Sequence, residues 1–382
     1  MSRKLLSLSV VSTLMGGTAL ADVPSVAVDI APVHSLVARV MDGVGTPNLI
    51  VQTGASPHEY SLRPSEAHAL QNADLVFWIG EDLTPWMEDA VETLATGATV
   101  TTLLELDGID LLDFREGALF EAHDHGHDED KHDDHDHGDH DHDDHAHDDH
   151  DDDEHAHDDH DHDEDHDHDK HAEGEDHAEH DHDGEHKHDD HAGHDDHDHE
   201  DHAGHDDHGH DHGEHDPHAW LSPGNASVWL NVIAAQLSAA DPDNAGAYFA
   251  NAAAARSELE TLSAEINTTL DPVRGRSFIV FHDAYQYFET DFDFPASGAI
   301  SIGDASDPSP ARIAEIQARI REEGVDCVLA EPQFNQGLVA TVLDGTNANT
   351  GVIDPLGAEL EPGPALYPQL IRNMAATLAD CL

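Results

Sequence analysis

Short apolar runs alternate with helix-like stretches along most of the chain. Each run has the length and the bounding turn residues of a β-strand. The predicted strands are Ser25–Ile30, Asn48–Val51, Leu75–Ile79, Thr99–Leu103, Phe278–Phe281, Ala299–Ile302, Asp326–Ala330 and Val352–Ile353. Helices are predicted at Ser35–Gly43, Pro64–Asn72, Pro310–Glu323 and from Tyr367 to the end. This alternation is typical of parallel strands with crossover helices, and it predicts an α/β fold with two lobes.

One long stretch without strand signals separates the two groups of strands. Asn244–Leu270 is rich in Ala, Glu and Leu and has no Pro, and no Gly after Gly246, which predicts one extended helix. We therefore predict an N-terminal α/β lobe over residues 22–243, a stiff linking helix over 244–270 and a C-terminal α/β lobe over 271–382.

Residues 123–216 interrupt the first lobe with a different composition. They consist almost entirely of His, Asp, Glu, Gly and Ala, and they contain 33 of the 38 histidines. Such a segment cannot bury enough apolar surface to offset the loss of chain entropy, so we predict a disordered insertion on the surface of one domain.

The formal charge of −68 is concentrated in the same segment. Residues 121–216 hold 45 Asp and Glu against three Lys, and the remaining chain carries −26 without a run of like charge. This acidity argues against nucleic acid and anionic lipid as partners.

The first 21 residues have the three parts of a cleavable secretory signal. A basic start at Met1–Lys4 leads into the apolar run Leu5–Met15, and Ala19-Leu20-Ala21 forms the cleavage site. The apolar run is shorter than the ~20 residues of a membrane span. No cysteine follows the cleavage site to carry a lipid. We expect a mature protein from about Asp22 that is soluble in the periplasm and not embedded in the membrane.

Cys327 and Cys381 are the only cysteines in the chain. In an oxidising compartment an isolated pair has a single disulfide connectivity, which we expect here. The bond would contribute on the order of 4 kcal/mol on the chain-entropy model. The alternative is two buried thiols.

Three histidines stand in similar surroundings. His58 follows a predicted strand, His282 directly follows another, and His218 lies between turn residues and an aromatic residue. Ligands of open α/β sheets bind at the carboxyl ends of the strands, and imidazole is the commonest metal ligand. Any one of the three alone is more often a cap or packing residue. Together they predict a site for Zn²⁺, which takes such ligands in tetrahedral geometry, with Asp354 or a water in the fourth position.

These motifs, with a His/Asp-rich insertion directly before Asp216-Pro217-His218, resemble those of the periplasmic zinc-binding proteins of ABC-type zinc importers. The resemblance covers essentially the whole mature chain. It implies two lobes joined by a rigid helix, with the metal held in the cleft between them. Carried over by motif, the metal ligands are His58, His218 and His282.

The third ligand position also bears on the metal. Relatives that bind manganese or iron usually have an acidic residue there, so His282 points to zinc, in line with its softer nitrogen ligand. Asp354 matches a position at which related proteins supply a carboxylate, and the paired cysteines of the family match Cys327 and Cys381.

The predicted function is high-affinity capture of Zn²⁺ in the periplasm and its delivery to the membrane permease of an ABC importer, by a monomer that is not an enzyme. The insertion should bind further zinc weakly. One alternative is a periplasmic zinc buffer in which the insertion is the whole function. The other is a secreted zinc hydrolase with Asp283 or Asp354 as the base, although the chain lacks a His-Glu-x-x-His signature.

Several other residues have expected structural roles. His34 should cap a helix or contact the site from behind, and Glu331, after a predicted strand, should make a structural hydrogen bond. The four tryptophans should pack in the core or in interfaces.

Overall fold

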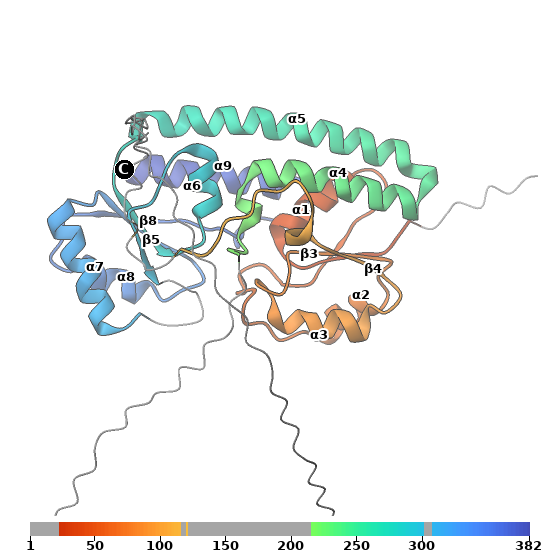
Figure 1. Cartoon of the computed structure of the whole chain (residues 1–382), viewed down its shortest axis with the longest axis horizontal. Coiled ribbons are helices and arrows are strands. Elements are labelled where there is room, and N and C mark those ends of the chain that lie inside the picture. Colours follow the sequence, from red (N-terminus) through yellow and green to blue (C-terminus); the bar gives the residue numbers. More distant parts are fainter. Residues whose placement is uncertain (1–22, 116–119, 121–214, 302–307) are drawn as a thin grey trace, which may run out of the picture. The chain divides into compact units, whose positions relative to one another are not determined.

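Two parallel β-sheets form the framework of the molecule (Figure 1). The computed structural model describes residues 23–115, 120, 215–301 and 308–382. The first sheet has the strand order β2-β1-β3-β4 and the second β6-β5-β7-β8, and all neighbouring strands are parallel. The strands are β1 (Val26–Val28), β2 (Asn48–Leu49), β3 (Leu75–Trp78), β4 (Thr99–Thr102), β5 (Phe278–His282), β6 (Ala299–Ser301), β7 (Cys327–Ala330) and β8 (Asn349–Val352). The predicted α/β fold with two lobes is confirmed.

Helices connect the strands and cover the sheets. They are α1 (Ala31–Val40), α2 (Pro64–Gln71), α3 (Pro85–Leu94), α4 (Pro223–Ala240), α5 (Ala245–Leu270), α6 (Gln286–Phe292), α7 (Pro310–Glu323), α8 (Gln336–Leu343) and α9 (Leu366–Cys381). Short 3-10 turns lie at Leu103–Glu105, Ala219–Leu221, Pro242–Asn244 and Asp271–Val273. α1 begins four residues before its predicted start, because Pro32 fits the first turn of a helix, where no backbone N–H is needed.

The last strand lies earlier than its apolar residues indicate. The prediction was Val352–Ile353, whereas β8 covers Asn349–Val352 and pairs with β7 from Cys327 to Ala330. β8 is an edge strand with largely exposed side chains, so its polar residues Asn349 and Thr350 carry no apolar signal.

One apolar core runs through both lobes. It includes Phe77 of the first sheet, Trp229 of α4, Leu262 of α5, Phe278 of the second sheet and Leu370 of α9. In Figure 1, α5 runs along α4 and α9. The linking helix is therefore packed against both lobes.

Two ion pairs tie the linking helix to the lobes. The guanidinium of Arg39 on α1 lies 2.7 Å from the Glu258 carboxylate, and that of Arg372 on α9 lies 2.8 Å from the Glu265 carboxylate. α1 and α9 also meet directly, since Tyr367 N donates to Ser35 Oγ at 2.9 Å. The lobes are joined by packing as well as by the chain.

The predicted disulfide between Cys327 and Cys381 is confirmed, and it joins the start of β7 to the end of α9. Among the described residues, no helix is long and apolar enough to cross a membrane. The predicted signal peptide 1–21 lies outside the described residues. So does the predicted insertion 123–216, apart from His215 and Asp216, which belong to the fold.

His34 lies on α1 and is buried in the first lobe. Its Nε2 donates to the Pro47 carbonyl at 3.1 Å, while its Nδ1 is buried without a hydrogen-bond partner. Burial lowers the pKa of this imidazole from its ordinary value of 6.5, although the bond to Pro47 raises it. His34 therefore resists protonation in the folded state.

We predict that His34 makes the protein less stable in mild acid. Below pH about 6.5 the unfolded state binds a proton that the folded state resists, so the free energy of unfolding falls with falling pH, by at most about 1.4 kcal/mol per pH unit for one group. In His34→Gln, the contribution of His34 to the dependence of the unfolding free energy on pH should disappear. Urea unfolding of metal-free protein between pH 5 and 7.5 measures it, and an equally steep loss in the variant would refute the assignment.

Candidate metal centre

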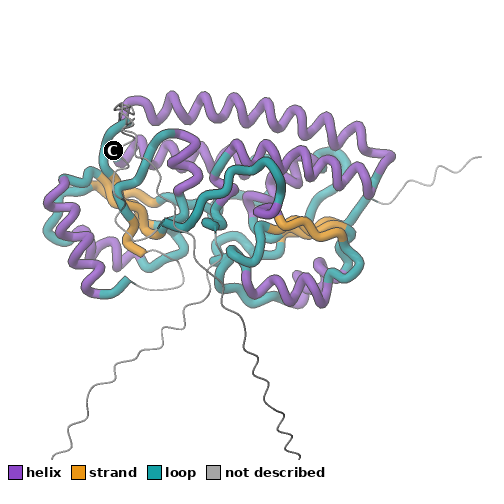
Figure 2. Tube along the Cα trace, in the orientation of Figure 1, coloured by secondary structure: helices purple, strands orange, loops and turns teal. Residues whose placement is uncertain are grey.

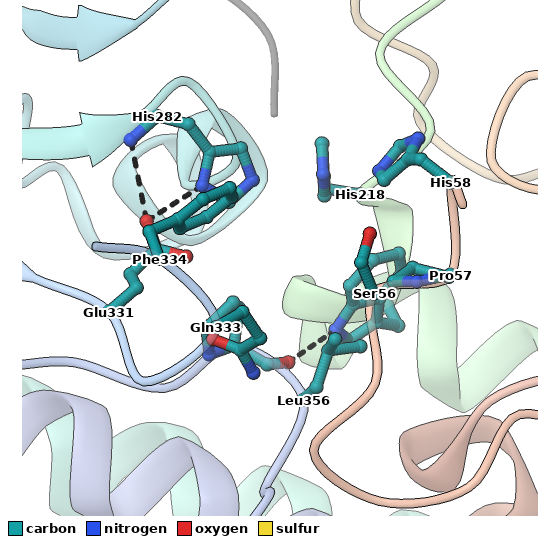
Figure 3. Close-up of a pocket in the computed structure, with 11 residues that line it drawn as sticks. Ser56, Pro57, His58, His218, His282, Glu331, Gln333, Phe334 and Leu356 are labelled. Atoms are coloured by element: carbon teal, nitrogen blue, oxygen red, sulfur yellow. Dashed lines mark hydrogen bonds and ion pairs between the residues drawn. The ribbon is translucent and has the colours of Figure 1, made fainter. Parts of the chain in front are cut away.

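The three predicted histidines come together in one pocket (Figure 3). His58 comes from the loop between β2 and α2, His218 from the residue before the turn Ala219–Leu221, and His282 from the end of β5. The ring centres of His58 and His218 are 5.8 Å apart, and those of His218 and His282 are 5.3 Å apart. The pocket is lined by Ser56, Pro57, His58, His218, Trp220, His282, Glu331, Gln333, Phe334, Pro355 and Leu356.

The spacing of the rings suits a shared ion. Imidazoles that bind one tetrahedral Zn²⁺ at about 2.0–2.1 Å have ring centres roughly 5 Å apart. Within the described residues, no group of three or more His, Cys, Asp or Glu is arranged, as it stands, to hold a metal ion. A shared ion would bring the rings, whose centres are 5.3 and 5.8 Å apart, slightly closer together.

His218 is held by a buried carboxylate. Asp216 Oδ1 accepts hydrogen bonds from His218 Nδ1 at 2.7 Å and from His218 N at 2.9 Å, and Asp216 is only 1% exposed. The Trp220 ring packs 5.2 Å from the imidazole, and its Nε1 donates to the Pro355 carbonyl at 2.8 Å. With its proton on Nδ1, the imidazole carries its lone pair on Nε2, the atom a metal would use.

His282 is held in the same way from the other lobe. Glu331 Oε1 accepts from His282 Nδ1 at 2.7 Å, and Glu331 is also only 1% exposed. Phe334 packs edge-on against the imidazole with ring centres 5.2 Å apart. His218 and His282 are each 5% exposed, so the protein fixes both the tautomer and the orientation of two buried rings.

A half-buried cation lies among carboxylates close to His218 and His282 in the chain. Arg115, 19% exposed, pairs with Asp283 at 2.6 Å and with Glu289 at 2.8 Å, and its guanidinium lies 3.7 Å from the centre of the Phe120 ring. Burial lowers the pKa of the Arg115 guanidinium, but the negative charges of Glu289 and then of Asp283 raise it above its ordinary value. One guanidinium thus joins two carboxylates that lie 168 and 174 residues away in the chain.

The carboxylates around this cation outnumber it. Burial raises the pKa of Asp216 and that of Asp283, each to about 7. The positive charge of Arg115 acts in the opposite direction on both pKa values. A divalent cation held by the neighbouring histidines would favour the ionised form of both carboxylates. The charge balance of this region therefore favours a cation in the pocket.

Asp354 occupies a different place from the three histidines. Its Oδ1 accepts from Leu356 N and Gly357 N, each at 3.0 Å, and its Oδ2 accepts from Ala358 N at 2.6 Å. Gln333 Nε2 donates to the same carboxylate at 3.2 Å, and Asp354 does not line the pocket. Asp354 shapes the loop that brings Pro355 and Leu356 to the pocket, and its role as fourth ligand stays a prediction, with water as the alternative.

Sequence patterns did not identify the roles of three residues at the site. The pattern around Asp216 indicates only a turn, and Arg115 carries no signal. Glu331 makes a buried hydrogen bond, as predicted, but its partner His282 cannot be read from the sequence. An aspartate two residues before a candidate ligand, as in Asp216-Pro217-His218, is the one local signal that could have been used. His34, considered as a contact behind the site, does not line the pocket.

Comparisons with known proteins point to one family of zinc-uptake proteins. The family model described as "Zinc-uptake complex component A periplasmic" matches residues 26–381. The chain is 44% identical to the high-affinity zinc uptake system protein ZnuA of Brucella abortus (strain 2308), over 94% of this chain and 91% of the relative. It is 40% identical to the protein of the same name from Paracoccus denitrificans (strain Pd 1222), over 98% and 97%.

Solved structures share the fold at lower identity. A crystal structure of ZnuA superimposes with a TM-score of 0.62 and 19% identity, over 94% of this chain and 99% of that chain. The Mn-bound periplasmic metal-binding protein from Candidatus Liberibacter asiaticus superimposes with a TM-score of 0.60 and 18% identity, over 93% and 98%. These likenesses concern the arrangement of helices and strands.

We predict that Arg115→Met destabilises the metal-free protein by about 3–5 kcal/mol, because it leaves buried carboxylates without their cation. Arg372→Met is the matched control: Arg372 is 43% exposed, and loss of its pair with Glu265 should cost only ~0–1 kcal/mol. Urea denaturation of both variants gives the two free energies. Equal losses in the two variants would show that Arg115 has no special role.

Proposed function

This chain belongs to the family of periplasmic zinc-uptake complex components, and on that premise we propose that it captures Zn²⁺ with His58, His218 and His282 and delivers it to the membrane permease of an ABC-type importer. The observation that carries the proposal is the convergence of three imidazoles, two of them held on Nδ1 by buried carboxylates. The names of the 44% and 40% identical relatives support zinc as the ion.

The donor set supports the choice of metal. Three imidazole nitrogens suit Zn²⁺, whereas Mn²⁺ and Mg²⁺ favour sites dominated by oxygen. The carboxylates of Asp216 and Glu331 are engaged with the imidazoles they orient. The transported ion would therefore meet nitrogen first, with Asp354 or water completing the tetrahedron.

Transport explains the site better than hydrolysis does. A zinc hydrolase needs a base beside the metal-bound water. Of the two residues considered for that role, Asp283 pairs with Arg115, and Asp354 accepts hydrogen bonds from three backbone N–H groups. A protein that only buffered zinc through the insertion would not need the pocket between the lobes.

The mature protein acts as a monomer in this proposal. The insertion, whose residues 121–214 lie outside the described part of the chain, adds weak and interchangeable zinc sites through its repeated imidazoles and carboxylates. Its contribution should therefore be separable from that of the pocket.

Zinc titration separates the two kinds of site. We expect mature protein to bind one zinc ion tightly and several weakly, and a version lacking residues 121–214 to keep only the tight site. Changing His58, His218 and His282 to Ala in that version should abolish tight binding. Calorimetry in competition with a chelator measures all three proteins. If tight binding disappears with residues 121–214 alone, the protein is a buffer.

The carboxylates behind the histidines should matter for affinity. Asp216→Asn and Glu331→Gln replace strong acceptors on Nδ1 with weaker amides, and each should weaken zinc binding about 10- to 100-fold. Asp29→Asn is the control: Asp29 is fully buried and accepts from backbone N–H groups of Ile30 and Ile79, away from the pocket. The same chelator competition measures the three variants, and wild-type affinity in Asp216→Asn and Glu331→Gln would contradict the prediction.

A further inference from the structure

The three histidines differ in how they are held. His218 and His282 are buried, and each is bound to a buried carboxylate, whereas His58 is half-buried on the loop that connects β2 with α2. This loop has no regular secondary structure from Val51 to Arg63. The position of the His58 backbone depends on what holds this loop.

The indole of Trp86 contacts this loop just before His58. Trp86 Nε1 donates a hydrogen bond of 2.7 Å to the carbonyl of Pro57, the residue directly before His58. Because the peptide unit is planar, fixing this carbonyl fixes the plane of the Pro57–His58 peptide. The proline ring restricts φ at Pro57 and also restricts the conformation of Ser56. The indole thus sets the position from which the His58 side chain departs.

The same indole holds the loop just after His58. The rings of Tyr60 and Trp86 pack with their centres 5.6 Å apart. The Tyr60 hydroxyl donates to Glu66 Oε1 at 2.8 Å, and Glu66 Oε2 accepts from Arg63 N at 2.8 Å at the start of α2. His58 lies between two points that are both anchored on Trp86.

Trp86 is itself well supported. It lies in the first turn of α3, and its side chain packs against the apolar cluster of the first lobe, which includes Met87, Trp78 and Leu70. Other side chains of this cluster are buried, so the indole is an extension of the core that reaches the loop.

We propose that Trp86 is a positioning residue that holds His58 in the metal site and thereby slows the release of the bound ion. The proposal rests on the proposed function, since it takes His58 as a zinc ligand. Loss of the indole N–H lets the Pro57–His58 peptide turn, so His58 leaves the ion more often. The two buried histidines remain in place.

The experiment compares zinc release from full-length mature Trp86→Phe, Trp78→Phe and wild-type protein. Each is loaded with one equivalent of zinc and mixed with excess chromogenic chelator in a stopped-flow instrument. Phe keeps a ring for Tyr60 and removes only the donor, so we expect release from Trp86→Phe to be roughly three- to tenfold faster, as for the loss of one hydrogen bond. Affinity should fall by a similar factor.

Trp78→Phe is the matched control, because the Trp78 Nε1 donates to Thr102 Oγ1 at 3.2 Å in the same lobe and not to a carbonyl of the loop. Release from this variant should equal the wild-type rate even if both variants lose a similar amount of thermal stability. Wild-type release from Trp86→Phe, or equally fast release from both variants, would overturn the proposal.

Two further variants keep the outcome unambiguous. Tyr60→Leu removes the ring contact with Trp86, together with the hydroxyl bond to Glu66, from the loop side without altering α3. It should also speed release, so the proposal can be tested even if Trp86→Phe folds poorly. His58→Ala tests the ligand itself. If His58→Ala leaves zinc binding unchanged, the proposed ligand set fails. If it weakens binding while both Trp86→Phe and Tyr60→Leu release zinc at the wild-type rate, only the role of Trp86 fails.

Discussion

Burying carboxylates costs free energy unless cations and hydrogen-bond donors meet them, and Asp216, Asp283 and Glu289 are all buried near the histidines. Arg115 meets two of them, and the backbone and imidazole of His218 meet the third. Much of the local structure follows from this requirement. The Arg115 side chain must extend from the first lobe to the carboxylates of Asp283 and Glu289 in the second. The residues on either side of the insertion must therefore lie close to the second lobe.

Hydrogen bonds also connect the residues on both sides of the insertion to the site. Asp216 N donates to the Leu112 carbonyl at 2.8 Å, and Asp113 pairs with His215 in an isolated antiparallel bridge. The Tyr287 hydroxyl accepts from Leu112 N at 3.1 Å and donates to the Asp216 carbonyl at 2.8 Å. Residues on both sides of a long insertion are thus fixed on α6 of the second lobe, and His218 follows directly.

The packing between the lobes limits how the site can change. In Figure 2, the loops that follow the strands lie between the two sheets, and they supply most of the pocket residues. Trp220 donates to Pro355 of the second lobe, and the Tyr367 hydroxyl of α9 donates to the Trp220 carbonyl at 2.9 Å. Wide separation of the lobes would break these buried contacts, so shifts of loops are the cheaper route to opening.

The sequence predicted the parts of this site that depend on local pattern. His282 ends a buried strand and Glu331 directly follows another, so the sequence placed both residues at the carboxyl ends of strands. Their hydrogen bond was not, because it requires β5 and β7 to be neighbours in the second sheet. Arg115 and Trp86 act through tertiary contacts that no local spacing encodes. β8 was misplaced because an exposed edge strand needs few apolar residues.

A transport site has to bind its ion tightly and still release it, and the unequal support of the three histidines suits both demands. A structural zinc site is closed by four protein ligands. Here two rings are buried, and the third, that of His58, is half-buried on a loop that Trp86 holds at Pro57 and Tyr60. The loop also approaches the second lobe, where a Cβ at Gly54 would lie 4.0 Å from that of Ala358. Gly54 has a φ of +84°, a conformation that favours glycine, so the chain can turn there before reaching His58. In the proposed site, ion release that begins at His58 would need only this loop to move and would leave the buried carboxylates and their cation undisturbed.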